Sequence, residues 1–305
     1  MRSRTWLRWS GLVLGLAVLG VVIARLAPHW DALAGAWSRL GAGHLLASIA
    51  CLFAAELAFA WAWHRLLRAP GESGRFADDA ARWATSLAGK YFPGKVWHAV
   101  ARYGLYHNGP HATRVAPAYL REMLLSFAVA MALVAWGAGD GPAVPMLRPL
   151  FALGALLLGL LAMPGPGEWV VAMIDRRWPG RLAVAATGWS AYLAAAIGQM
   201  GGYVLLGLGI FALGRGLGWF QADEAPLAIA AFCFAGLAGV AALFVPAGIG
   251  VREAALAWFL APALGAGPAL MVAVLARAWI SLGEAACIGA GLAWLRKPRA
   301  GAPTA

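Results

Sequence analysis

The chain has 305 residues, of which 62% are hydrophobic and 12% are charged, and its formal net charge is +11. A soluble domain carries about 25% charged residues, so this composition excludes an ordinary soluble protein and indicates a polytopic membrane protein. Lys and Arg collect in the cytoplasmic loops of such proteins, so the positive charge calls for no nucleic-acid partner.

Six apolar stretches are predicted to cross the bilayer, which takes about 20 mostly apolar residues. They cover residues 9–24, 43–64, 117–137, 149–163, a span between 183 and 213, and 269–294. The first stretch follows a basic N-terminus, so it is either an uncleaved span, which we favour, or a cleaved signal peptide. A short interfacial helix is expected within 164–181. In the fifth span, Gly198 and Gly202 form the small-xxx-small pattern of a helix contact.

Two further apolar segments contain residues that break helices. Pro93 and Gly94, flanked by Lys90 and Lys95, interrupt the segment between 82 and 102. Residues 225–267 are interrupted at Pro246, Gly248 and Gly250. We expect two re-entrant helical hairpins, because non-helical backbone is tolerated in a bilayer only where protein or a cavity surrounds it. For 225–267, two full spans joined by a cytoplasmic turn are the alternative.

The distribution of basic residues predicts the topology. With both termini in the cytoplasm and each hairpin counted as no crossing, most Lys and Arg residues fall on the cytoplasmic side of an inner membrane. Residues 43–138 and 187–294 then share the plan of span, hairpin and span in opposite orientations. This predicts an inverted repeat within a single membrane domain, 1–305, followed by a short polar tail at 296–305. Substrate sites of such repeats lie near the midplane.

The stretch GKYFPGKVW, residues 89–97, resembles a nucleotide-binding loop but lacks the Ser or Thr that should follow Lys95. A different interpretation is favoured. Half-helices that begin after Gly94 and Gly250 carry Lys95 and Arg252 in their first turns. A cation there is unfavourable by about 0.3–1 kcal/mol unless an anion lies nearby, so the pattern predicts an anion site between the two breaks. The alternative is a structural role, in which these cations pair with nearby glutamates.

Other charges within the predicted membrane segments support a polar centre, since each costs about 2.5–3.5 kcal/mol at mid-bilayer when it faces lipid. We expect five cations to bind a lipid phosphate: Lys90, Lys95, Arg121, Arg252 and Arg277. Four carboxylates are expected to orient them or to carry a coupling proton: Glu56, Glu122, Glu253 and Glu284. No cofactor or metal site is expected, because Cys51, Cys233 and Cys287 lack metal-ligand spacing.

The stretches KYFPGKVW at 90–97 and VPAGIGVREAAL at 245–256 resemble the two signature stretches of the lysylphosphatidylglycerol synthase transmembrane-domain family, which is described as flippase-like. The resemblance covers most of the chain, from the second span to the last. Trp97 and His98 stand where many members have Gly and Glu, as in a Pro-Gly-Lys-Val-Trp subgroup. The chain ends soon after Arg296, so we expect no soluble aminoacyl-transferase domain.

The resemblance implies a transporter, not an enzyme, that moves an anionic or zwitterionic phospholipid or a polyprenyl-linked glycan between leaflets. A homo-oligomer or an association with a partner enzyme is compatible with this hypothesis. Two alternatives stay open: a membrane enzyme that acts on a lipid phosphate, such as a glycosyl transferase, and a non-catalytic partner subunit. The first would need a catalytic carboxylate or histidine and larger loops than this sequence offers.

Overall fold

The structure is a computed structural model that describes residues 35, 38–68, 72, 74–92, 96–107, 109, 111–137, 144–177, 187–243 and 245–297. Across these ranges the fold is all-helical, as predicted, and contains no strand. The α-helices are α3 (Ala42–Leu67), α4 (Phe76–Ser86), α5 (Val96–Gly104), α6 (Ala112–Gly137), α7 (Val144–Ala162), α8 (Pro166–Arg177), α9 (Trp189–Gly216), α10 (Ala225–Ala241), α11 (Val251–Leu264) and α12 (Ala266–Arg296). Two 3-10 turns, η2 (Leu87–Tyr91) and η3 (Pro246–Gly248), lie between short helices.

Four helices are long and apolar enough to cross a membrane: α3, α6, α9 and α12. They correspond to the predicted spans at 43–64, 117–137, 183–213 and 269–294. The predicted span at 149–163 lies in α7, whose residues 147–162 reach the length of a span only together with α8, across a bend of 71°. Helix α8 occupies the position of the expected interfacial helix. The stretch 9–24 lies outside the described residues. The chain is therefore a multi-pass helical membrane protein.

The long helices keep apolar side chains on their outer faces. Leu150, Leu153 and Leu157 of α7 are exposed, as are Leu46 and Leu57 of α3. Contiguous apolar surface of this kind is unfavourable in water, and it suits a hydrocarbon environment.

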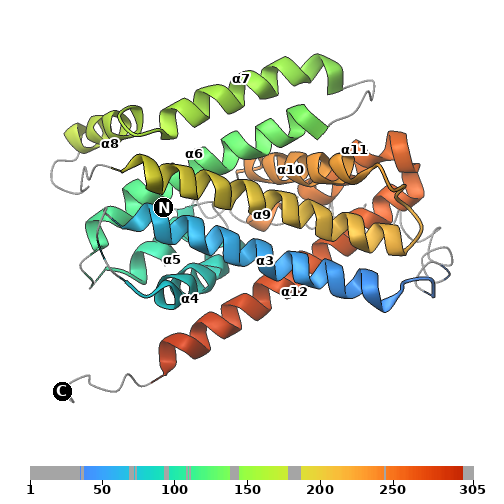
Figure 1. Cartoon of the computed structure of the whole chain (residues 1–305), viewed down its shortest axis with the longest axis horizontal. Coiled ribbons are helices and arrows are strands. Elements are labelled where there is room, and N and C mark those ends of the chain that lie inside the picture. The colour runs from blue at the N-terminus through green and yellow to red at the C-terminus, as the bar shows by residue number, and fades with distance from the viewer. Residues whose placement is uncertain are drawn as a thin grey trace, which may run out of the picture.

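Helices α3 and α9 lie side by side through the middle of the molecule (Figure 1). Their close approach depends on small residues in α9. A Cβ atom added at Gly198 would lie 2.8 Å from the carbonyl oxygen of Ala58 in α3, and one at Gly202 would collide with the ring of Phe59. The predicted small-xxx-small contact is confirmed, and it brings the two halves of the chain together.

Two pairs of short helices lie at opposite ends of the long ones (Figure 1). Helices α4 and α5 have 11 and 9 residues, and α10 and α11 have 17 and 14. Each is shorter than the roughly 20 residues that a span requires. Helix α4 packs against α3 and α12, and α10 packs against α9 and α6. The turns η2 and η3, one from each pair, touch each other.

The break between α10 and α11 lies where the sequence predicts it. Ala247, Gly248 and Gly250 have positive φ values of 49°, 69° and 82°. Gly248 is needed for space as well as for conformation, because a Cβ atom there would lie 2.8 Å from the Cα atom of Gly239 in α10. Pro93, Gly94 and Lys95 of the other predicted break lie outside the described residues.

Candidate functional site

A cavity of about 270 Å³ lies where the two interrupted segments meet the long helices. Its walls come from all the described α-helices except α7 and α8, together with η2 and η3. The structure brings several predicted site residues to this one cavity: Glu56, Lys90, Glu122, Arg252, Arg277 and Glu284. Residues far apart in the sequence therefore share one polar centre.

Arg252 forms no ion pair with any described residue, although the carboxylates of Glu284 and Glu253 influence it electrostatically. It lies in the first turn of α11, and its guanidinium is 4.5 Å from the centroid of the Phe232 ring in α10. It makes no hydrogen bond or ion pair with any residue that the structure describes. The cation–π contact supports the guanidinium but leaves its N–H donors open to the cavity.

Glu284 joins the first interrupted segment to α12. Lys90 Nζ of η2 donates to Glu284 Oε1 at 3.2 Å, and the Tyr91 hydroxyl donates to Oε2 at 2.8 Å. Both carboxylate oxygens thus accept a hydrogen bond, and the Lys90 ammonium group is held at the cavity wall.

Glu253 and Arg277 hold the second break in place. The Glu253 carboxylate accepts a hydrogen bond from the backbone N–H of Gly250 at the start of α11. Its other oxygen lies 3.5 Å from Arg277 Nε, and Arg277 Nη1 donates to the carbonyl of Ala247 at 3.3 Å. Glu253 does not line the cavity, and its contacts are those of a carboxylate that positions both the break and Arg277.

Arg102 is the most deeply buried cation of the site, and the sequence analysis did not identify it. It is fully buried, and its Nη1 donates to Glu122 Oε2 at 2.5 Å. Its Nη2 lies 3.0 Å from His98 Nε2, and its guanidinium is 4.4 Å from the centroid of the Trp63 ring. His98 and Arg102 are four residues apart on α5, and this spacing is the signal that could have identified them.

Uncharged polar side chains also line the cavity, beside apolar ones such as Phe59, Leu206 and Val240. Ser126 of α6 and Tyr203 of α9 share a hydrogen bond of 2.7 Å between their hydroxyl oxygens. The Tyr119 hydroxyl lies 3.2 Å from His98 Nδ1, and Gln199 also lines the cavity. These groups can both donate and accept hydrogen bonds, so they suit a hydrated or phosphate-bearing ligand.

Arg121 lies elsewhere. Its Nη2 donates to Glu168 Oε1 of α8 at 2.6 Å, and it does not line the cavity. Adjacent residues on a helix point about 100° apart, so α6 directs Glu122 to the cavity and Arg121 to α8. Arg121 is therefore not placed to bind a phosphate in this cavity. Lys95 lies outside the described residues.

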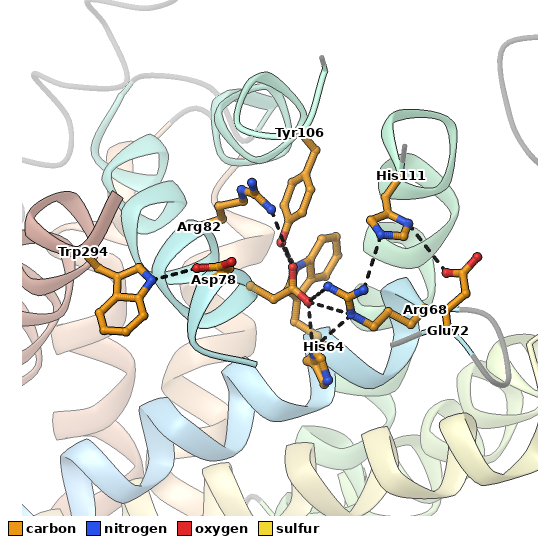
Figure 2. A network of polar contacts seen from close by, with 10 residues as sticks. His64, Arg68, Glu72, Asp78, Arg82, Tyr106, His111 and Trp294 are labelled. Carbon is orange, nitrogen blue, oxygen red and sulfur yellow. Dashed lines mark hydrogen bonds and ion pairs between the residues drawn. The ribbon is translucent and has the colours of Figure 1, made fainter. Parts of the chain in front are cut away.

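A second polar network fixes α4 at the end of the molecule where α3 finishes (Figure 2). Asp79 of α4 is fully buried and accepts from Arg68 Nη2 at 2.6 Å and from the Tyr106 hydroxyl at 3.1 Å. His64 Nδ1 lies 2.7 Å from the same carboxylate. Burial and the nearby Asp79 carboxylate raise the pKa of Tyr106, which keeps its phenol protonated as a donor.

The network extends from α4 to α12 and to the start of α6. Trp294 Nε1 of α12 donates to Asp78 at 2.9 Å (Figure 2). His111 Nε2 lies 3.4 Å from Arg68 Nη1, and burial together with this guanidinium lowers the pKa of His111. The network meets the cavity wall through Trp63, whose Nε1 donates to the Tyr106 hydroxyl at 3.0 Å and whose ring contacts Arg102. Its contacts hold the first interrupted segment against α3 and α12.

Within the described part of the chain, no group of three or more His, Cys, Asp or Glu side chains is placed to hold a metal ion. Comparison with known proteins adds no further constraint: no protein-family model matches the chain, and no curated protein matches it. The resemblance of the two interrupted segments to the flippase-like family stays a prediction.

Proposed function

We propose that this protein binds the phosphate of an anionic phospholipid or a lipid-linked glycan in the central cavity and moves it between the leaflets of the inner membrane. The observation that carries the proposal is the unpaired guanidinium of Arg252, which lies between membrane-spanning helices and lines the cavity. A charge in such a place is functional by default, because a structural role would give it a partner.

The charge balance of the cavity favours an anion. Lys90 is paired with Glu284, Arg102 with Glu122, and Arg277 with Glu253. Three of the four nearby carboxylates are thus engaged by other cations, and the fourth, Glu56, forms no ion pair with Arg252. With Glu56 protonated, the site carries one uncompensated positive charge. Helix α11 also begins at this point, and its N-terminal dipole adds positive potential beside Arg252, which the Glu253 carboxylate bound to the Gly250 N–H offsets in part. A phosphate oxygen is a suitable partner, since guanidinium donors match it geometrically.

The size of the cavity limits how a lipid can bind. The cavity, of about 270 Å³, accommodates a headgroup phosphate. The acyl chains would stay in the bilayer while the headgroup crosses the protein interior. The desolvated phosphate would be neutralised there by Arg252, with Lys90 and Arg277 nearby.

The arrangement of the helices supports alternating access to this site. The chain passes twice through the order of long helix, short pair and long helix, first as α3 to α6 and then as α9 to α12. Contacts are reciprocal, because α4 of the first set packs on α12 of the second and α10 of the second packs on α6 of the first. We propose that these sets are inverted repeats and that each short pair is a re-entrant hairpin that gates one side.

The experiment is a leaflet assay with the full chain reconstituted in phosphatidylcholine vesicles that contain a fluorescent phosphatidylglycerol. Arg252→Ala should reduce probe movement about 10-fold or more, because a charged hydrogen bond contributes about 1.5–3 kcal/mol. Arg252→Lys should retain part of the rate. Arg114→Ala, at a half-exposed surface pair with Glu72, is the matched control and should move lipid as the wild type does. Unchanged movement in a folded Arg252→Ala variant would refute the site.

A further inference from the structure

Glu56 differs from every other carboxylate of the cavity. It lies near the middle of α3, it is 6% exposed, and it lines the cavity. Its Oε2 atom is buried without a hydrogen-bond partner, and its side chain makes no ion pair or hydrogen bond with any described residue. Glu122 and Glu284, the other carboxylates that line the cavity, each have at least one donor within hydrogen-bond distance. Glu253, outside the cavity lining, accepts from the Gly250 N–H.

An ionised carboxylate cannot persist at low cost in such a place. Burying a charge without a partner or a donor is far more expensive than burying a neutral acid, so the group takes up a proton instead. A purely structural role does not account for this residue, because a neutral acid without a partner adds no contact that a glutamine or an apolar side chain could not replace.

The charges around Glu56 make its protonation depend on what occupies the cavity. Those with the most direct influence are Lys90 of η2, Arg252 of α11 and Glu284 of α12. The other titratable or charged groups that face the cavity, or Glu56 itself, are His98, Arg102, Tyr119, Glu122, Tyr203, Arg277 and Cys287. Lys90, Arg102 and Arg277 are paired, so Arg252 is the cation whose effect on Glu56 an incoming anion can change.

The direction of the coupling follows from the signs of these charges. With the cavity empty, the Arg252 guanidinium favours the carboxylate form of Glu56 and hence release of its proton. An anion bound at Arg252 neutralises that cation and adds negative charge, so it favours the protonated form. The proton and the anion should therefore bind together, and linkage requires that each strengthens the binding of the other.

We infer that Glu56 is a proton-binding site in the cavity and that it takes up a proton when the anion binds at Arg252. The existence of the proton site stands on the geometry of Glu56 alone, whereas its coupling rests on the proposed function. A proton gradient across the membrane would then supply energy for moving the anion, because each loaded site carries both species.

The first measurement tests the proton site without any ligand. Infrared spectra of the full chain in phosphatidylcholine nanodiscs, recorded from acidic to alkaline pH, should contain a protonated carboxylic acid band that titrates in the wild type. Glu56→Gln, which is nearly isosteric, should lose this band. Asp223→Asn removes an exposed carboxylate in the loop between α9 and α10 and should keep it. A band unchanged in Glu56→Gln would overturn the inference.

The second measurement tests the coupling with a short-chain phosphatidylglycerol as the probe. Calorimetry in buffers of different ionisation enthalpy should detect proton uptake on binding to the wild type. Affinity should weaken by about tenfold as the pH rises through the titration of Glu56, within the usual range of coupling between sites. Glu56→Gln should bind the probe without proton uptake and without this pH dependence, and Asp223→Asn should behave as the wild type.

The outcomes separate the two proposals. Equal pH dependence and equal proton uptake in wild type and Glu56→Gln would overturn the coupling while leaving the anion site intact. A titrating band that Glu56→Gln removes, in a protein that binds no probe at any pH, would support the proton site and refute the proposed function. Thermal unfolding of both variants in the same nanodiscs verifies that they are folded.

Discussion

At the scale of single residues, pairing separates the structural charges from the candidate functional ones. Arg102 and Glu122 satisfy each other in a buried cluster with Trp83, whose Nε1 donates to Glu122 Oε1 at 3.0 Å. Arg252 and Glu56 have no such partners among the described residues. The paired charges hold helices together. The unpaired ones have hydrogen-bond donors or acceptors that a ligand or a proton can bind.

This distinction predicts a large stability effect at Glu122. Glu122→Gln leaves the buried Arg102 guanidinium without its counter-charge, so we expect the free energy of unfolding to fall by about 3–5 kcal/mol. Denaturant titration in detergent micelles measures the change. Glu72→Gln, which removes a half-exposed partner of Arg114, is the control and should cost only about 0–1 kcal/mol. Equal losses in the two variants would contradict the assignment of Arg102 and Glu122 as a structural pair.

At the scale of elements, the two interrupted segments meet at the central cavity. Their turns touch, and each segment carries a cation to the cavity, Lys90 from η2 and Arg252 from α11. Two side chains hold the backbone of the second break: Glu253 accepts from the N–H at the start of α11, and Arg277 donates to the Ala247 carbonyl. A change in the break should therefore affect both stability and the position of Arg252.

Gly248→Ala tests the break directly. The left-handed conformation costs a residue with a Cβ atom about 1–2 kcal/mol, and contact with the Gly239 backbone adds to the loss. We expect a lower free energy of unfolding together with slower lipid movement. Gly289→Ala in α12, where a Cβ atom meets nothing within 4 Å, is the matched control and should be neutral or slightly stabilising. A Gly248→Ala variant as stable as Gly289→Ala would contradict the close approach of the break to α10.

At the scale of the whole molecule, the basic residues lie mostly at one end. Figure 1 places the last turns of α3, α8 and α12 at the same end as α4 and the start of α6. These elements and their flanks carry Arg65, Arg68, Arg75, Arg82, Arg114, Arg176, Arg177, Arg296 and Lys297. Among the described residues, the opposite end carries Arg39, Arg148 and Arg215 near the ends of α3, α7 and α9. The asymmetry favours the first end as the cytoplasmic one.

Cysteine labelling in intact cells tests this orientation. In a variant without Cys51, Cys233 and Cys287, we introduce Asp223→Cys or Lys297→Cys, both at exposed positions on opposite ends of the molecule. A membrane-impermeant maleimide should label the cysteine at 223 in spheroplasts and the one at 297 only after permeabilisation. Labelling of both positions from the same side would contradict the topology.

The sequence alone predicted the class of the protein, the four long apolar helices and the break between α10 and α11. Apolar run length sets spans, and Pro and Gly set breaks, so both are local properties that a sequence records. It also identified Glu56, Lys90, Arg252, Arg277 and Glu284 as intramembrane charges. These predictions needed no knowledge of which helices are neighbours.

Which charges are paired depends on the tertiary structure. Lys90 and Glu284 are far apart in the chain, and the sequence could not distinguish Arg121, which binds Glu168, from Glu122, which faces the cavity. The burial of Arg102 depends on α3, α4 and α6 packing around α5, so the sequence alone does not reveal it. A buried charge that pairs with a residue of another helix has a structural role, whereas a buried charge without such a partner is a candidate binding site. Which of the two applies depends on how the helices pack and not on local composition.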